Sequence, residues 1–67
     1  MKVQVNGEDQ ELAGSLSVSA FLEEIGMDAP RGVAIAVNDT VVPRSKWEEV
    51  RLQEGDTVEI IRATQGG

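Results

Sequence analysis

Few side chains in this 67-residue sequence could carry out catalysis. It contains no Cys and no His, which excludes a thiolate nucleophile, a disulfide, a zinc–sulfur site and the commonest general base. Its serines therefore have no imidazole to activate them. The carboxylate pairs Glu23–Glu24 and Glu48–Glu49 are neighbours in sequence, and adjacent helical residues do not face each other, so we interpret them as solvated surface. We expect no catalytic residue and no metal ligand, and we predict that the chain is not an enzyme.

The remaining reactive group is the carboxylate of the C-terminal Gly67. We predict a last strand from Thr57 to Ala63, followed by a tail that can extend roughly 13 Å from the domain. This tail, which we expect to be flexible, consists of Thr64, Gln65, Gly66 and Gly67. Glycine lacks a Cβ and adopts backbone conformations closed to other residues, so such an end can enter a narrow pocket of another protein. The alternative is that the two terminal glycines are a frayed end without function.

A carboxylate is a poor acyl electrophile until it is activated. We therefore expect a partner protein to convert the Gly67 carboxylate, most simply to an acyl adenylate. A sulfur nucleophile could then replace the adenylate and leave a thiocarboxylate. On this hypothesis the chain supplies the reacting carbon, and a partner supplies the catalysis.

Charge and hydropathy narrow the range of partners. Six Lys and Arg against twelve Asp and Glu give a formal net charge of -6, which disfavours nucleic acid as a partner and favours a basic patch on another protein. The alternative is that the charge serves solubility alone. No apolar run is long enough to span a membrane, and the start lacks the apolar stretch of a signal peptide. We therefore expect a cytoplasmic protein that binds neither nucleic acid nor membranes.

The first half of the chain predicts a hairpin followed by a helix. Residues 2–5 alternate polar and apolar side chains, as a half-buried strand does, and Asn6–Gly7 is the strongest short hairpin signal, so a second strand is expected over about residues 8–12. Ser17 is a good helix N-cap, and Gly26 suits the left-handed position after a helix. Between them, apolar residues at helical spacing form one stripe: Val18, Phe21, Leu22 and Ile25.

The second half predicts another hairpin, a short turn and the last strand. Residues 33–37 form a third strand, Asn38–Asp39 can close a two-residue turn, and residues 40–42 return beside it. Residues 45–48 are typical of a short turn or 3-10 segment. One apolar helix face and one sheet can bury each other in an α+β domain. We expect a mixed sheet of four to five strands with one helix packed across it, and the first and last strands parallel at its centre.

Strand alternation also predicts a docking surface. In the last strand Val58 and Ile60 should face the helix, which leaves Ile61 on the open side of the sheet. In the third strand Ala34 and Ala36 should point the same way as Ile61. We predict that Ile61, Ala34 and Ala36 form an apolar partner-binding patch near the tail, although isolated exposed apolar residues are also ordinary.

Two further side chains have alternative interpretations. Strict alternation would turn Arg62 inward, so we expect it to lie at the sheet end and reach solvent, unless a bulge shifts the register. Trp47 is the sole tryptophan, and we interpret it as a lid over the edge of the core, the alternative being a binding anchor.

The layout and ending resemble the ubiquitin-like β-grasp family, and within it the resemblance to the ThiS family covers essentially the whole chain. Four stretches carry it: Val3-Gln4-Val5-Asn6-Gly7-Glu8, then Val37-Asn38 with Val41-Val42-Pro43-Arg44-Ser45-Lys46-Trp47, then Glu54-Gly55-Asp56-Thr57-Val58-Glu59-Ile60, and the terminal Gly66-Gly67. Asn38–Asp39 departs slightly from a commoner Asn-Gly. The resemblance implies a β-grasp domain over residues 1–63 and a flexible tail over residues 64–67.

The resemblance also implies a function. An E1-like enzyme of the ThiF type would adenylate Gly67, with Gly66 as its companion, using ATP and magnesium. Sulfur from a persulfide, ultimately supplied by a cysteine desulfurase, would give a thiocarboxylate. Thiazole synthase would then take that sulfur for the thiazole ring of thiamine. The chain would be a carrier and co-substrate, with no bound cofactor and monomeric on its own.

Two other functions stay open at this point. The first is a sulfur carrier of another pathway, similar to the small subunit of molybdopterin synthase. That family usually has a longer chain with a Phe-rich approach to the Gly-Gly, which is absent here. The second is a non-carrier class, either a ubiquitin-like modifier joined to lysines or an interaction module.

Overall fold

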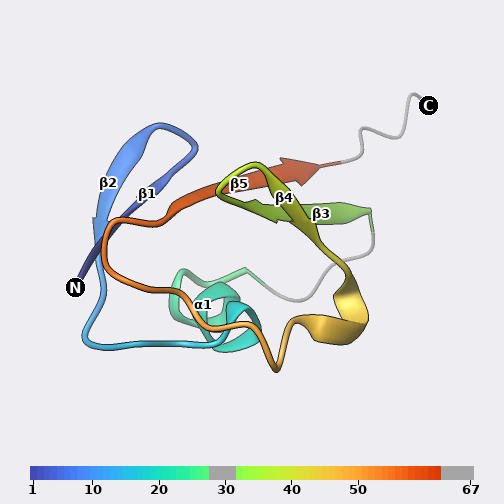
Figure 1. Ribbon diagram of the computed structural model, residues 1–67, viewed down its shortest axis with the longest axis horizontal. Helices are drawn as coiled ribbons and strands as arrows, with labels where there is room; N and C mark the ends of the chain where they lie inside the picture. Colours follow the sequence, from blue (N-terminus) through green and yellow to red (C-terminus); the bar gives the residue numbers. More distant parts are fainter. Residues whose placement is uncertain (28–31, 63–67) are drawn as a thin grey trace.

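In the computed structural model, which describes residues 1–27 and 32–62, five strands form one mixed sheet and one α-helix packs across it (Figure 1). The strand order is β2-β1-β5-β3-β4. The elements are β1 (Lys2–Val5), β2 (Glu8–Glu11), α1 (Val18–Glu24), β3 (Val33–Val37), β4 (Thr40–Val42), the 3-10 helix η1 (Arg44–Lys46) and β5 (Thr57–Arg62). The predicted α+β architecture is confirmed.

The strand β5 lies at the centre of the sheet. It pairs with β1 in parallel, with Gln4 opposite Thr57 and Val5 opposite Val58. On its other side it pairs with β3 in antiparallel register, from Val37 opposite Val58 to Val33 opposite Arg62. The expected parallel pairing of the first and last strands is therefore confirmed. This pairing places the β1–β2 hairpin on one side of β5 and the β3–β4 hairpin on the other (Figure 1).

Both hairpins are closed by the predicted two-residue turns. Asn6 and Gly7 have φ angles of 51° and 86°, and Asn38 and Asp39 have φ angles of 52° and 69°. Two successive positive φ angles match the right-handed twist of the flanking strands. Asn and Asp tolerate this region better than other residues with a Cβ, which is why the second turn closes without a glycine.

Both ends of α1 are formed by the residues that predict them. The hydroxyl oxygen of Ser17 accepts a hydrogen bond of 3.0 Å from the backbone N–H of Ala20. At the other end Gly26 has a φ angle of 81°. The N–H of Met27 donates to the carbonyl oxygen of Leu22 at 2.8 Å. This bond is the long one of a Schellman motif, which satisfies carbonyls that the helix leaves free.

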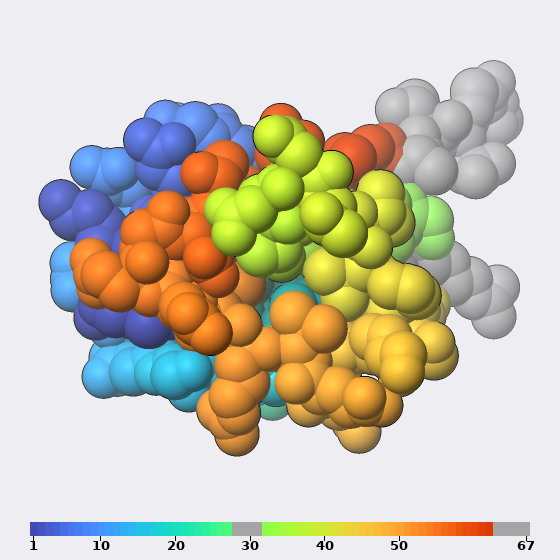
Figure 2. Space-filling view, viewed as in Figure 1, coloured from blue at the N-terminus to red at the C-terminus, as the bar shows by residue number. Residues whose placement is uncertain are grey.

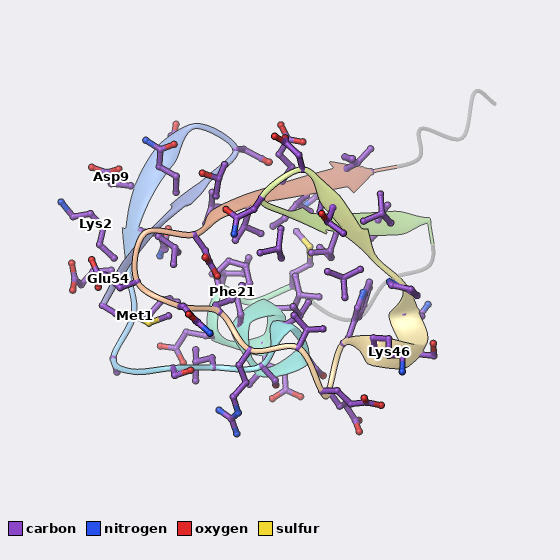
Figure 3. The ribbon with its side chains drawn as sticks, viewed as in Figure 1. Met1, Lys2, Asp9, Phe21, Lys46 and Glu54 are labelled. Atoms are coloured by element: carbon purple, nitrogen blue, oxygen red, sulfur yellow. The ribbon has the colours of Figure 1, made fainter. Side chains whose placement is uncertain are left out.

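The core lies between α1 and the inner face of the sheet. Phe21 points from α1 into this space and has no exposed surface (Figure 3). Trp47 is buried too, and its indole Nε1 donates a 2.9 Å hydrogen bond to the carbonyl oxygen of Val42. The expected structural role of Trp47 is confirmed, since a buried indole is not available as a surface anchor. The core cluster comprises Val3, Leu12, Val18, Phe21, Leu22, Ile35, Val42, Trp47, Leu52 and Val58.

The long connection between β4 and β5 packs over the core and ends beside β1, where the N–H of Gly55 donates to the carbonyl oxygen of Lys2 at 2.8 Å. In the space-filling view this connection and β4, coloured yellow-green to orange, cover much of the face shown, and little of the teal helix α1 is visible behind them (Figure 2). Leu52, in the middle of the connection, is fully buried. The connection is therefore part of the packed domain, and the open face of the sheet lies on the side opposite α1.

Candidate functional site

The end of β5 brings an exposed apolar side chain to the open face of the sheet. Val58 is fully buried, whereas Ile61 keeps 50% of its surface exposed. Ile61 lies directly opposite Ala34 of β3, and Ala34 is also exposed. The predicted alternation is therefore correct for both residues, and it places them side by side.

Ala36 differs from the prediction. It was expected to be exposed beside Ala34, but only 5% of its surface is accessible. Strand alternation still directs it to the open face, where its register partners are Glu59 on β5 and Val41 on β4. Its methyl group is shorter than either neighbour, so the two flanking side chains cover it. Ala36 therefore lies beneath the surface, and a partner would contact its neighbours first.

The most exposed large apolar side chain among the described residues, Val41 at 63%, was not included in the predicted patch. The same alternation finds it, because its neighbour Val42 is buried in the core and its register partner Ala36 faces outward. We define the outer apolar patch as Ile61, Ala34 and Val41, with Ala36 beneath them. It crosses three adjacent strands, β5, β3 and β4.

Arg62 is the last residue that the structure describes. It is exposed and lies opposite Val33 at the end of an uninterrupted β3–β5 register. The prediction that Arg62 lies at the sheet end and reaches solvent is therefore confirmed without a bulge. Ala63, at the predicted end of the strand, and the tail residues Thr64, Gln65, Gly66 and Gly67 lie outside the described residues. Their predicted roles, and the predicted division of the chain at residue 63, stay predictions.

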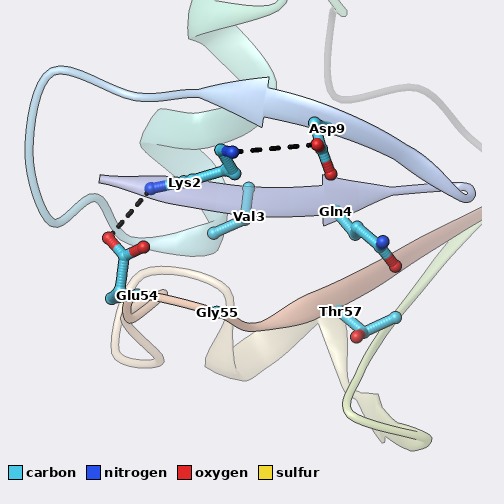
Figure 4. A pocket seen from close by; sticks show the side chains of 7 residues that line it. All are labelled: Lys2, Val3, Gln4, Asp9, Glu54, Gly55 and Thr57. Carbon is cyan, nitrogen blue, oxygen red and sulfur yellow. Dashed lines mark hydrogen bonds and ion pairs between the residues drawn. The ribbon is translucent and has the colours of Figure 1, made fainter.

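A second candidate site is a hollow at the end of the sheet where β5 begins. It has a volume of about 370 Å³ and is lined by Lys2, Val3, Gln4, Asp9, Glu54, Gly55 and Thr57 (Figure 4). The Lys2 Nζ lies 3.8 Å from an Asp9 carboxylate oxygen, and the Lys2 backbone N–H donates to Glu54 at 3.0 Å. Lys2 and Asp9 thus form a solvated ion pair, which contributes little to stability, and the Glu54 carboxylate is held by a backbone N–H. In residues 1–27 and 32–62 no group of carboxylates could hold a metal ion.

A comparison with protein families places the whole chain in context. A model described as the ThiS family matches residues 3–67. The chain belongs to the ThiS family. The match includes β1 from Val3 onward, the other four strands, the helix and the Gly66–Gly67 end.

Relatives and solved structures agree with this ThiS assignment. The sulfur carrier protein ThiS of Thermus thermophilus is 34% identical over 65 residues, covering 97% of this chain and 98% of that protein. The sulfur carrier protein ThiS of Escherichia coli is 28% identical and matches over the full length of both. A crystal structure of a thiamine biosynthesis protein (ThiS) from Geobacter metallireducens superposes with a TM-score of 0.87 at 28% identity, covering both chains completely. The expected ubiquitin-like β-grasp fold is confirmed.

A longer kind of protein also matches this chain. The thiazole synthase of Paramagnetospirillum magneticum is 39% identical over all 67 residues, and the thiazole synthase of Magnetococcus marinus is 34% identical over the same length. The chain spans 20% of the length of each of these two proteins. A ThiS-like region is thus part of the same polypeptide as a thiazole synthase in these relatives.

No helix in residues 1–27 and 32–62 is long and apolar enough to cross a membrane.

Proposed function

We propose that this chain is the sulfur carrier protein of thiamine biosynthesis, in which the Gly67 carboxylate is converted to a thiocarboxylate. The match to the ThiS family over residues 3–67 carries the proposal. Relatives named sulfur carrier protein ThiS are covered over 98% and 100% of their own length. The chain's own composition agrees, because it holds neither Cys nor His for chemistry of its own.

The proposed chemistry takes three steps, which begin at the Gly67 carboxyl group. The carboxylate attacks the α-phosphate of ATP and releases pyrophosphate, which leaves an acyl adenylate. The terminal sulfur of a persulfide then attacks the acyl carbon and displaces AMP. Cleavage of the remaining S–S bond by a thiol leaves the thiocarboxylate. The carrier contributes the acyl carbon, and partner enzymes contribute the catalytic residues and the ATP and magnesium.

The partners in this proposal are an E1-like adenylating enzyme of the ThiF type, a persulfide source supplied by a cysteine desulfurase, and thiazole synthase. The two thiazole synthase relatives support the last of these, since they join a ThiS-like region to that enzyme in one chain. The outer apolar patch is the docking surface in our account. Ile61 stands six residues before Gly67 in sequence, so an enzyme that binds Ile61 has the carboxyl end within reach.

Intact-mass measurement after reaction separates this function from its alternatives. The full-length protein is incubated with a ThiF-type enzyme, ATP, magnesium and a persulfide source, and a sample without ATP is the control. A sulfur carrier gains the mass difference between one sulfur and one oxygen atom, and only with ATP. A ubiquitin-like modifier forms a larger covalent adduct instead, and an interaction module shows neither change. Either of these two results would refute the proposal.

The receiving pathway is tested with the loaded protein. Thiazole synthase should consume the thiocarboxylate and return the original mass. If molybdopterin synthase consumes it and thiazole synthase does not, the chain belongs to the other sulfur pathway, and the thiamine assignment is wrong.

A further inference from the structure

The strand that leads toward Gly67 has little support from one of its neighbours. On the β1 side, β5 has only two register partners, with Gln4 opposite Thr57 and Val5 opposite Val58. The chain then turns away at Asn6 to form the first hairpin. Without another group in this position, β5 would lose its partner on that side after Val58.

The side chain of Asn6 provides one more rung of the sheet. Its Oδ1 accepts a 2.8 Å hydrogen bond from the backbone N–H of Ile60, and its Nδ2 donates to the carbonyl oxygen of Ile60 at 3.5 Å. Its own backbone N–H donates to the carbonyl oxygen of Val58 at 2.9 Å. A primary amide carries the same donor and acceptor as a peptide group. The Asn6 side chain therefore continues the ladder where the β1 backbone has already turned away.

This contact fixes the backbone next to the outer apolar patch. The short bond from the Ile60 N–H holds the peptide group that joins Glu59 to Ile60, one residue before Ile61, and the longer contact with the Ile60 carbonyl oxygen adds to it. On the opposite side, Ile61 is held by its pairing with Ala34. β5 thus has hydrogen-bonding partners on both sides as far as Ile60. From Ile61 to Arg62 it has partners on the β3 side.

We propose that Asn6 is a positioning residue for sulfur loading. Its amide holds the end of β5 so that Ile61 and the segment leading to Gly67 meet the adenylating enzyme in one orientation. This proposal rests on the proposed carrier function. A residue that appears in the sequence as hairpin-turn chemistry thereby also orients the last described residues of β5.

The chain contains a matched control for this role in Asn38. Asn38 also has a positive φ angle in a two-residue turn, and its Oδ1 also accepts from β5, at 3.0 Å from the N–H of Thr57. Thr57 begins β5, whereas Ile60 is near its end. Glycine suits both positions of such turns. Asn6→Gly and Asn38→Gly therefore remove the same kind of bond from opposite ends of one strand.

Amide hydrogen exchange tests the contact itself. In Asn6→Gly the exchange rate of Ile60 should rise, relative to Leu22 in α1, by roughly fivefold, which is the effect of losing one ordinary hydrogen bond. In Asn38→Gly that ratio should stay at the wild-type value, because the affected amide is Thr57. Dividing the Ile60 exchange rate by the Leu22 exchange rate corrects for any change in global stability that affects both amides. An unchanged ratio in Asn6→Gly, or an equal rise in both variants, would overturn the proposal.

Adenylation kinetics test the consequence for function. With a ThiF-type enzyme, Asn6→Gly should raise the KM for the carrier several-fold with kcat little changed, and Asn38→Gly should keep the wild-type KM. Asn6→Asp keeps the acceptor for the Ile60 N–H but loses the Nδ2 donor to the Ile60 carbonyl oxygen, so it should recover only part of the loss. Equal kinetic constants for Asn6→Gly and Asn38→Gly would contradict the positioning role. If the wild-type protein is not adenylated, the carrier function itself is wrong, and the positioning role, which depends on it, falls as well.

Discussion

Ile61 on β5 and Ala34 on β3 lie directly opposite each other on the open face of the sheet. Because the alanine side chain is a single methyl group, it leaves the isoleucine uncovered on that side, and half of the Ile61 surface is exposed. The pair therefore presents an apolar surface close to the end of the strand that leads toward Gly67. This arrangement makes the docking role of the outer apolar patch testable with single substitutions.

The substitution Ile61→Asp should weaken binding to the adenylating enzyme much more than it weakens the fold. A carboxylate at this position would have to be desolvated on docking, which is costly without a partner charge. Because Ile61 is half exposed, we expect the free energy of unfolding to fall by about 1 kcal/mol or less, within the span of strand propensities. Calorimetric titration with the enzyme and thermal unfolding measure the two effects.

The control for Ile61→Asp is Thr57→Asp, which adds the same charge to an exposed residue at the other end of the same strand. Thr57→Asp should bind the enzyme nearly as well as the wild-type protein. A large drop in melting temperature for Ile61→Asp would show that Ile61 belongs to the core. Equal weakening by both variants would show that the enzyme responds to charge and not to the outer apolar patch.

The substitution Trp47→Phe should destabilise the protein without abolishing loading. Phenylalanine retains an aromatic ring but removes the Nε1–H that donates to the carbonyl oxygen of Val42 at 2.9 Å. The Val42 carbonyl oxygen then loses one hydrogen bond, so we expect a loss of about 1 kcal/mol in the free energy of unfolding, measured by urea denaturation. Loss of enzyme binding with unchanged stability would instead make Trp47 a contact residue.

The substitution Ser17→Ala tests the predicted start of α1. It removes the hydroxyl that accepts from the Ala20 N–H at 3.0 Å, and loss of such an N-cap costs about 1 kcal/mol. Ser17→Asp restores an acceptor and should recover most of that stability in the same thermal unfolding experiment. If Ser17→Asp is as unstable as Ser17→Ala, the hydroxyl does not act through the cap.

Most of the fold could be predicted from the sequence because local signals agree with one another. Asn6–Gly7 and Asn38–Asp39 specify tight turns through the φ angles they tolerate, and Ser17 and Gly26 mark the two ends of the helix. Alternation of side chains then assigns a face to each strand residue. The orientation of Ile61 follows from this alternation, since Val58, three residues earlier, must be in the core.

The features that could not be predicted from the sequence depend on the register between neighbouring strands of the sheet. Ala36 is buried because Glu59 and Val41 happen to flank it, and this requires the register of both neighbouring strands. Val41 lies in a strand of only three residues, and its place beside Ala36 follows only once the register of β3 with β4 is known. The contact of Asn6 with Ile60 joins residues 54 positions apart, so nothing in the local sequence around Asn6 indicates it.

The measurement that tests the carrier function most directly is localisation of the sulfur after loading. The full-length protein and a variant lacking Gly67 are each treated with a ThiF-type enzyme, ATP, magnesium and a persulfide source, then fragmented in the mass spectrometer. We predict that sulfur replaces a carboxyl oxygen of Gly67 in the full-length protein, and that the shortened protein unfolds at the same temperature but stays unloaded. Loading of the shortened protein, or sulfur on any other residue, would contradict the account.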